Sequence, residues 1–258
     1  MTFGVYNMEK VKIHKNYNIA DGIYRMVIKG NFKGKPGQFY MIRGWDLEPV
    51  LWRPISINMI NDTEIWFLYK VFGVGTNILK DLKPGDSIEI NGPLGNGFSI
   101  ENEGRTAIVS GGIGIAPMEY LLTKLNRNNT DLFIGFRDQP FLIDEIKNMV
   151  NRVFTASENG SAGHKGYVTD ILNLKDYDRV YCCGPEIMMN KVLKMADLNN
   201  KKIYVSLEKR MACGVGACLG CAVWTKSGVK RACKEGPVFS GDELILDEVQ
   251  PWKTKCLD

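Results

Sequence analysis

Residues 106–117, TAIVSGGIGIAP, combine an apolar strand pattern, a glycine-rich turn and the start of a helix. Glycine lets the backbone turn sharply and approach a pyrophosphate, and the N-terminus of the following helix favours its negative charge. This order is typical of the first strand, turn and helix of a nucleotide-binding α/β domain, although the glycine spacing differs from the usual Rossmann fingerprint. A compact turn without a ligand is the structural alternative. The candidate binding residues are Gly111, Gly112, Gly114 and Pro117.

Strand and helix patterns alternate downstream of this turn, which predicts a parallel sheet covered on both faces. A second strand-end turn, Cys183-Gly184-Pro185, is expected at the same sheet edge, where ligands gather in open α/β sheets. It is a further candidate for nicotinamide binding. Strands are expected at 132–136, 152–156, 180–184 and 203–207, and helices at 118–126, 143–151, 168–174 and 186–196.

The sequence before residue 100 has a different pattern, with short β-rich segments separated by glycine, proline, asparagine and aspartate. Many short strands with one short helix predict a small antiparallel barrel. The expected strands lie at 10–15, 23–29, 38–43, 55–60, 63–71 and 87–90. At 258 residues the chain suits this barrel (1–100), an α/β domain (101–205) and a cysteine-rich segment (206–258).

Three short motifs in the barrel favour a flavin dinucleotide. FAD needs a cation and a hydroxyl near its pyrophosphate, main-chain groups beside its ring and a helix N-terminus for its phosphate charge. Taken alone, Arg53 and Ser56 could equally be a surface arginine and a strand-end serine that bind no ligand. The candidate FAD residues are Arg53, Pro54, Ile55 and Ser56, then Tyr69, Lys70 and Val71, then Gly75 and Thr76.

The run ACGVGACLGCAVWTKSGVKRAC, residues 212–233, carries cysteines spaced Cys-x4-Cys-x2-Cys-x11-Cys. This is the ligand spacing of a plant-type two-iron, two-sulfur cluster, in which a glycine-rich loop supplies three thiolates. Small residues between the ligands leave amide N–H groups free to point at sulfur. The candidate metal ligands are Cys213, Cys218, Cys221 and Cys233, which together indicate a [2Fe-2S] cluster.

Competing interpretations of the cysteines have less support. Structural zinc favours two Cys-x2-Cys knuckles, and this run has one. A disulfide framework does not suit an odd total of seven cysteines in a chain that begins without a signal-peptide pattern. Cys182, Cys183 and Cys256 follow no ligand spacing and are expected to be buried thiols.

Composition excludes several functions. The net charge of +4 is spread without a basic block, which argues against nucleic-acid binding. The longest apolar stretch, residues 106–118, is too short and too rich in glycine to span a membrane, so a cytoplasmic protein is expected. His14 and His164 lie near no nucleophile or metal-ligand pattern, which argues against a histidine-based hydrolase.

The order of the motifs at Arg53–Ser56, Gly111–Pro117 and Cys183–Pro185 resembles the ferredoxin-NADP reductase superfamily, which pairs an FAD-binding barrel with a nicotinamide-binding α/β domain. LEKRMACGVGACLGCAV and VKRACKEGPVFSGDEL narrow this resemblance to the electron-transfer subunits of NAD-dependent (type B) dihydroorotate dehydrogenases, over nearly the entire chain. The wider superfamily has an aromatic residue at the position of Ile55.

The resemblance implies an oxidoreductase subunit of pyrimidine biosynthesis. Electrons from the FMN of a separate catalytic subunit, which oxidises dihydroorotate, would pass through the [2Fe-2S] cluster and FAD to NAD⁺. The implied assembly is a heterotetramer with two copies of each subunit, and the loop 211–222 and the tail 248–258 are candidates for its docking face. Asp138, after the second predicted parallel strand, favours NAD through a ribose hydroxyl, whereas the adjacent Arg137 favours NADP; the resemblance favours NAD.

Two other functions remain open at this point. One is the FAD and iron–sulfur subunit of a ferredoxin-dependent NADH:NADP oxidoreductase or a sulfide dehydrogenase, whose cluster can include a non-cysteine ligand. The other is an iron–sulfur redox sensor without catalytic turnover.

Overall fold

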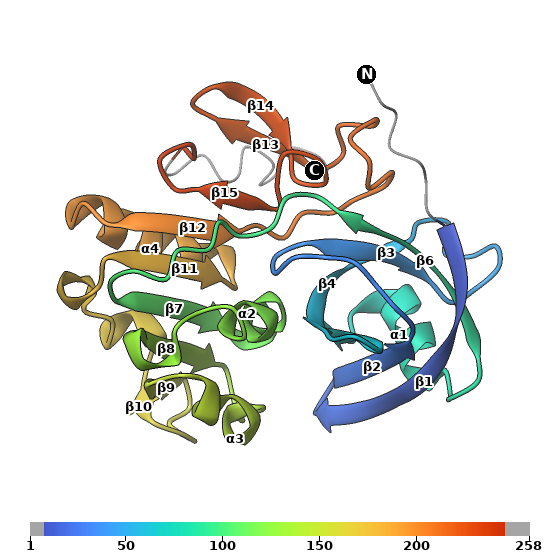
Figure 1. Ribbon diagram of the computed structural model, residues 1–258, viewed down its shortest axis with the longest axis horizontal. Helices are drawn as coiled ribbons and strands as arrows, with labels where there is room; N and C mark the ends of the chain where they lie inside the picture. Colours follow the sequence, from blue (N-terminus) through green and yellow to red (C-terminus); the bar gives the residue numbers. More distant parts are fainter. Residues whose placement is uncertain (1–7, 246–258) are drawn as a thin grey trace, which may run out of the picture.

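The computed structural model describes residues 8–245 as a closed barrel, a seven-stranded sheet and a small hairpin (Figure 1). Neighbouring barrel strands all pair antiparallel, in the order β1-β2-β5-β4-β3-β6, so the predicted antiparallel barrel is confirmed. Alternate side chains enclose an aliphatic and aromatic core. The strands are β1 (Met8–Ala20), β2 (Ile23–Lys29), β3 (Phe39–Arg43), β4 (Arg53–Ile60), β5 (Glu64–Lys70) and β6 (Ser87–Leu94), and one helix, α1 (Gly73–Asp81), follows β5.

The second sheet has the order β10-β9-β8-β7-β11-β12-β15, and all neighbours pair parallel except β15. Its strands are β7 (Thr106–Gly111), β8 (Thr130–Phe136), β9 (Arg152–Ser157), β10 (His164–Lys165), β11 (Arg179–Cys183), β12 (Lys202–Ser206) and β15 (Val238–Ser240). Strands β7 and β11 are buried throughout, which explains their nearly continuous apolar sequence. The predicted parallel sheet is confirmed, with an antiparallel edge strand added by the cysteine-rich segment.

Helices cover both faces of this sheet. Helix α2 (Ile115–Leu122) lies between the sheet and the barrel, and every one of its residues is buried (Figure 1). Helix α4 (Glu186–Leu198) has the amphipathic pattern of a helix on an outer face, with Met189, Val192, Leu193 and Ala196 buried. Helix α3 is short, because only Ile143–Ile146 is α-helical before a 3₁₀ turn at Lys147–Met149.

The predicted helix at 168–174 is wrong. Two 3₁₀ turns, Val168–Asp170 and Leu174–Asp176, occupy this region. The Asp170 carboxylate accepts hydrogen bonds from the Tyr167 amide at 2.9 Å and from Lys191 at 3.0 Å, which holds the first turn in a non-helical path. Asn173 accepts from the Lys175 amide and starts the second turn in the same way.

The cysteine-rich segment packs against both larger parts. Its hairpin consists of β13 (Ala222–Thr225) and β14 (Gly228–Arg231), and β15 then joins β12 through the pairs Tyr204–Ser240, Val205–Phe239 and Ser206–Val238. Gly214, in the cysteine loop, lies against the barrel so closely that an added Cβ would be 2.7 Å from Met41 Cγ. The loop therefore has direct contact with strand β3.

Among residues 8–245, no helix combines the length and apolar character needed to cross a bilayer. The tail at 248–258, including Cys256, lies outside the described residues. Cys182 and Cys183 are buried, as predicted.

Candidate cofactor-binding site

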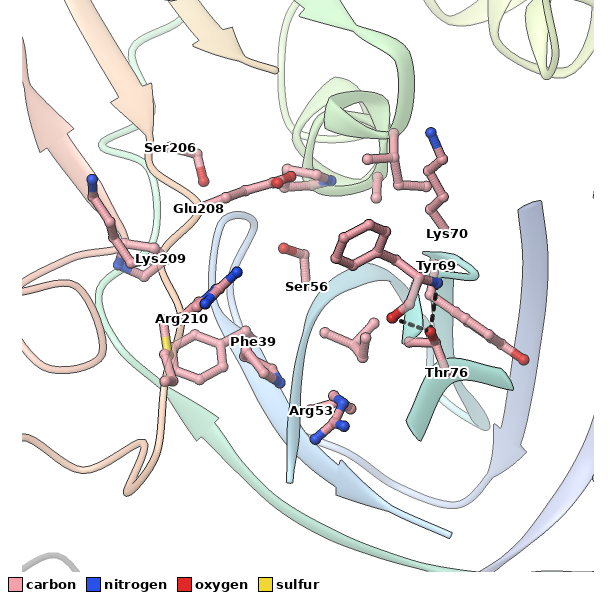
Figure 2. Close-up of a pocket in the computed structure, with 18 of the residues that line it drawn as sticks. Phe39, Arg53, Ser56, Tyr69, Lys70, Thr76, Ser206, Glu208, Lys209 and Arg210 are labelled. Atoms are coloured by element: carbon pink, nitrogen blue, oxygen red, sulfur yellow. Dashed lines mark hydrogen bonds between the residues drawn. The ribbon is translucent and has the colours of Figure 1, made fainter. Parts of the chain in front are cut away.

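A cleft of about 770 Å³ separates the barrel from the parallel sheet. Figure 2 shows Ser56, Glu208 and Arg210 around its middle, with Arg53 and Thr76 toward the barrel helix. The structure brings nine of the sequence-predicted residues together in its wall, namely Arg53, Pro54, Ile55, Ser56, Tyr69, Lys70, Thr76, Pro117 and Cys183.

The barrel end of the cleft is suited to an anion. Arg53 lines it, and among residues 8–245 no carboxylate pairs with its guanidinium, which donates to the Leu51 carbonyl and lies over the Trp45 ring. Gly75 makes room for this arginine, because an added Cβ would lie 2.5 Å from Arg53 Nε. Helix α1 points its N-terminus at the same place, with no acidic residue in its first turn and no side-chain cap. A cation beside a helix N-terminus without a side-chain cap is suited to bind a phosphate group.

Flat and hydroxyl-bearing groups line the middle of the cleft. Ile55 and Tyr69 come from neighbouring barrel strands, and Ser56 adds a hydroxyl group. Tyr69 donates from its Oη to Asn16 Oδ1 at 3.0 Å, which fixes the ring, and burial raises its pKa so that the phenol stays neutral. This wall suits an aromatic ring system with a polar edge.

The sheet end of the cleft is formed by strand ends that lie in register. Ser110, Cys183 and Ser206 are direct neighbours across β7, β11 and β12. The turns that follow are in contact, since an added Cβ on Gly114 would collide with the Cys183 carbonyl and one on Gly184 would lie 2.8 Å from the Gly111 amide. Burial raises the pKa of the Cys183 thiol well above its usual value, so it stays protonated. Only glycine allows two main chains to approach in this way.

Some predicted residues do not line the cleft. Val71 packs against the barrel core. Gly114 and Gly184 allow close main-chain approach, Gly75 and Gly111 lie against side chains, and no atom lies within 4 Å of an added Cβ on Gly112. Pro185 packs against Gly111 and begins α4. Asp138 lies in the bend after β8, where its carbonyl accepts from Ser161 and its carboxylate from Asn159 at 3.5 Å.

Sequence reasoning missed the end of β12 and the stretch that follows it. Ser206, the last residue of β12, and then Glu208, Lys209 and Arg210 line the cleft, and Arg210 has no acidic partner within residues 8–245. The surroundings of the cleft desolvate the Glu208 carboxyl and raise its pKa. These residues follow a parallel strand, at the end of the sheet where ligands usually bind, and this position could have indicated a role in binding. Phe39 and Met211 also line the cleft on the side of the cysteine loop.

The four predicted cysteine ligands differ in exposure. Cys218 is exposed, Cys213 is half-buried, and Cys221 and Cys233 are buried. Their thiols interact as two pairs, Cys213 with Cys218 and Cys221 with Cys233. Within residues 8–245, no three His, Cys, Asp or Glu side chains are arranged around a single metal ion. Two pairs fit a two-iron cluster, in which four thiolates are shared between two irons.

Backbone amides point at the cysteine sulfurs. The Gly216 N–H donates to Cys233 Sγ at 3.1 Å and the Ala217 N–H to Cys213 Sγ at 3.3 Å. Burial alone would raise the pKa of Cys213, but the surrounding donors, first the Val215 amide, lower it to about 6. Burial and the neighbouring Cys221 raise the pKa of Cys233 to about 12. A bound metal ion would favour the thiolate form of this residue.

Comparisons with known proteins agree with this arrangement. Residues 208–245 match the model of the iron–sulfur cluster binding domain of dihydroorotate dehydrogenase B. The electron transfer subunit of dihydroorotate dehydrogenase B (NAD(+)) from Clostridium acetobutylicum is 53% identical over 94% of this chain and 98% of its own length. Its counterpart from Clostridium perfringens is 50% identical over 91% and 97%.

The chain belongs to the family of dihydroorotate dehydrogenase B electron transfer subunits. A solved structure of an NADH-dependent reduced ferredoxin-NADP oxidoreductase is also similar, with a TM-score of 0.82 and 31% identity over 93% of this chain and 91% of that one. A ferredoxin-NADP⁺ reductase from Neisseria gonorrhoeae, at 15% identity and a TM-score of 0.59, shares the fold. Within this family, the barrel, sheet and cysteine segment of the present chain form one oxidoreductase unit.

Proposed function

We propose that this chain transfers electrons from a dihydroorotate-oxidising catalytic subunit to NAD⁺, using FAD in the cleft and a [2Fe-2S] cluster at the four cysteines. The observation that carries the proposal is a cleft that joins both cofactor motifs and extends to Met211, two residues before the first cysteine of the cluster motif. Relatives named as electron transfer subunits, at up to 53% identity, support the same activity. The bound FAD would exchange a hydride with nicotinamide and single electrons with iron–sulfur.

The residues at the barrel end fit the FAD pyrophosphate. Arg53 is a half-buried cation without an acidic partner in the described part of the chain, beside a helix N-terminus. We assign Arg53 and the Gly75–Thr76 turn to phosphate binding, the Ser56 hydroxyl to the polar edge of the flavin ring, and Tyr69 to its aromatic face. The backbone of Lys70 and Val71 runs beside this wall.

The residues at the sheet end fit a nicotinamide. The contacting turns at Gly111–Gly114 and Cys183–Pro185 leave a shallow floor bordered by Pro117. The neutral Cys183 thiol adds no charge where the uncharged carboxamide would lie, and the N-terminal end of α2 is available to the pyrophosphate. We propose NAD as the substrate, with Asp138 at the adenosine ribose, supported by the names of the relatives.

The exposed side of the cysteine loop is the proposed docking face for the catalytic subunit. Cys218 is exposed, Leu219 beside it is 59% exposed, and the cross-strand pair Trp224 and Val229 is 50% and 47% exposed. Apolar side chains around a solvent-facing cluster ligand suit a partner that must approach the cluster closely. We propose that the partner carries FMN and forms a heterotetramer of two copies of each subunit.

Anaerobic reconstitution tests the cofactors. The purified chain should bind FAD, show iron–sulfur absorbance and reduce a dye with NADH much faster than with NADPH. Arg53→Ala should lose FAD and NADH activity together, whereas Arg127→Ala, an exposed arginine elsewhere, should retain both. Absence of flavin in the reconstituted wild type, or a clear NADPH preference, would contradict the corresponding assignment.

Variants of the cysteines test the cluster. Cys218→Ser should remove the iron–sulfur absorbance but leave FAD and NADH-dependent dye reduction, whereas Cys182→Ala, at a buried cysteine outside the ligand spacing, should keep the cluster. Co-expression with the catalytic subunit should give dihydroorotate:NAD⁺ activity that Cys218→Ser abolishes. A cluster that survives in Cys218→Ser, or a preference for reduced ferredoxin and NADP as partners, would favour the other oxidoreductase class.

A further inference from the structure

Helix α2 joins the two halves of the cleft. It begins directly after the Gly112–Gly114 turn, and all of its residues are buried between the sheet and the barrel. Most of them are apolar, but Glu119 is charged and 4% exposed. Two polar side chains of the barrel meet it, Arg25 from β2 at 2% exposure and Asn58 from β4 at 0%.

These side chains form a hydrogen-bonded cluster. Asn58 Nδ2 donates to the Ala116 carbonyl at 3.0 Å and to Glu119 Oε2 at 2.9 Å. Arg25 Nη2 donates to the same Glu119 oxygen at 3.0 Å, and Arg25 Nη1 donates to Glu145 Oε2, from α3, at 2.6 Å. Two helices of the nucleotide-binding side, α2 and α3, and two barrel strands, β2 and β4, are thus tied through one junction.

The junction is not the arrangement that stability alone favours. Arg25 Nε and Asn58 Oδ1 are buried and have no hydrogen-bond partner within residues 8–245. Unpaired buried polar atoms are costly, and well-packed apolar side chains are often as stabilising as a buried ion pair. Apolar surfaces can also slide past each other, whereas directional hydrogen bonds define one orientation. A role in orientation therefore accounts for polar groups at this contact.

The position of Asn58 connects the two cofactor motifs directly. It follows Ser56 by two residues on β4 and lies at the irregularity between Ile57 and Met59 in the pairing with β5. Ala116, whose carbonyl Asn58 holds, follows Gly114 by two residues at the start of α2. One side-chain amide thereby fixes the flavin strand against the first turn of the nucleotide helix.

We propose that Asn58, together with Glu119 and Arg25, is a positioning residue that sets the distance between the nicotinamide floor and the flavin wall. This inference rests on the proposed function. Hydride donors and acceptors must lie about 3 to 3.5 Å apart, and a misplacement of about 1 Å can cost roughly 100-fold in rate. Asn58 is fully buried and does not line the cleft, so it acts through the main chains that it joins.

Asn58→Asp tests this role with almost no change in volume. The new carboxylate cannot donate to Ala116 or to Glu119, so the tie is lost. At saturating NADH, the rate constant for flavin reduction, per bound FAD, should fall roughly tenfold or more, and the charge-transfer absorbance of the nicotinamide–flavin complex should weaken. The FAD content and the NADH dissociation constant should stay within about twofold of the wild type.

Two further variants sharpen the test. Asn61→Asp makes the same chemical change just beyond β4, where Asn61 only accepts hydrogen bonds from Thr63 through its side chain, and it should behave as wild type. N58D combined with E119Q restores a donor opposite the new carboxylate and the original net charge, and should recover much of the lost rate. If N58D binds no FAD, N58L, an apolar variant of similar shape that also lacks the donors, should show the fall in rate.

The results distinguish three cases. A lower rate and charge-transfer absorbance in N58D, recovered in the double variant, support the inference. Normal flavin reduction per bound FAD in N58D and in N58L, with only thermal stability or FAD content reduced, would show a purely structural role and overturn it. Failure of the wild type itself to reduce bound FAD with NADH would instead contradict the proposed function.

Discussion

The two ends of the strands in the parallel sheet differ in how their polar side chains are paired. At the edge where β7, β11 and β12 end, glycine turns touch, Arg210 lacks an acidic partner in the described structure, and a cleft opens. At the edge where these strands begin, charges are paired within the chain. Asp131 is 1% exposed and accepts from Arg152, Asn151 and Tyr177, at 2.7, 2.8 and 2.7 Å.

This difference suggests that one end of the strands contributes mainly to stability and the other mainly to ligand binding. The satisfied edge holds the sheet together through its own side chains, as in the contacts of Glu101 with Arg179 and Lys202. The cleft edge leaves donors and cations available, which is useful only when ligands bind there. Variants at one edge should therefore change the free energy of unfolding, and variants at the other should change turnover.

The largest effect is expected for Asp131→Ala. It leaves two arginines and a buried tyrosine hydroxyl without their acceptor, and the free energy of unfolding should fall by about 3 kcal/mol. Urea unfolding measures this, and flavin reduction by NADH per bound FAD should be unchanged. Asp144→Ala, at a 92% exposed carboxylate paired with Lys147, is the control and should be nearly neutral. A strong loss of turnover in Asp131→Ala would contradict the separation.

Gly114→Ala should mainly lower the rate of flavin reduction, whereas Asp131→Ala mainly lowers the free energy of unfolding. The new methyl group collides with the Cys183 carbonyl and separates the two turns of the proposed nicotinamide site. NADH-dependent flavin reduction should fall roughly 100-fold, measured by stopped-flow absorbance. Gly112→Ala is the control, because no atom lies within 4 Å of its added Cβ and only the strain of its φ of 52° remains. Equal losses in both variants would contradict the steric explanation.

Acid should reduce the contribution of Asp131 to the free energy of unfolding over a limited pH range. The pKa of Asp131 is lowered to about 2, because hydrogen bonds, first from Arg152, outweigh the effect of burial. A lowered folded-state pKa stabilises above the unfolded value near 3.9, and this contribution of about 2 kcal/mol is lost as the pH falls from about 4 to about 2. The stability difference between wild type and Asp131→Asn should therefore shrink over that range. A constant difference in urea unfolding would contradict the assignment.

Tyr177→Phe should give the smallest effect. It removes the buried hydroxyl that donates to Asp131 and keeps the ring packed edge-on against Phe133. Because the acceptor is charged, a loss of about 1.5 kcal/mol is expected in the free energy of unfolding, with unchanged turnover. Tyr167→Phe, on a 61% exposed ring, is the matched control for removing a phenol.

Local motifs could be predicted from the sequence, and long-range contacts could not. The cysteine spacing and the glycine turns are contained in short stretches, so the cluster ligands and the nicotinamide turn could be assigned as candidates. The apolar stretch VTDILNL suggested a helix, but Asp170 and Asn173 hold their own local turns there. Asn58 and Glu119 lie far apart in sequence, and no periodic pattern shows that they meet at 2.9 Å. Arg210 could have been anticipated from its place after a parallel strand.

Strand β15 joins the outer edge of the parallel sheet to the cysteine-rich segment. Only residues 234–237 separate Cys233 from β15, which covers the outer edge of β12 through Val238 and Phe239. In a cell starved of iron, a segment that loses its metal is loosened next to this strand. Uncovering β12 would present unpaired backbone groups, which are templates for aggregation. A protein that fails to acquire its cluster would therefore be less soluble, in addition to losing electron transfer.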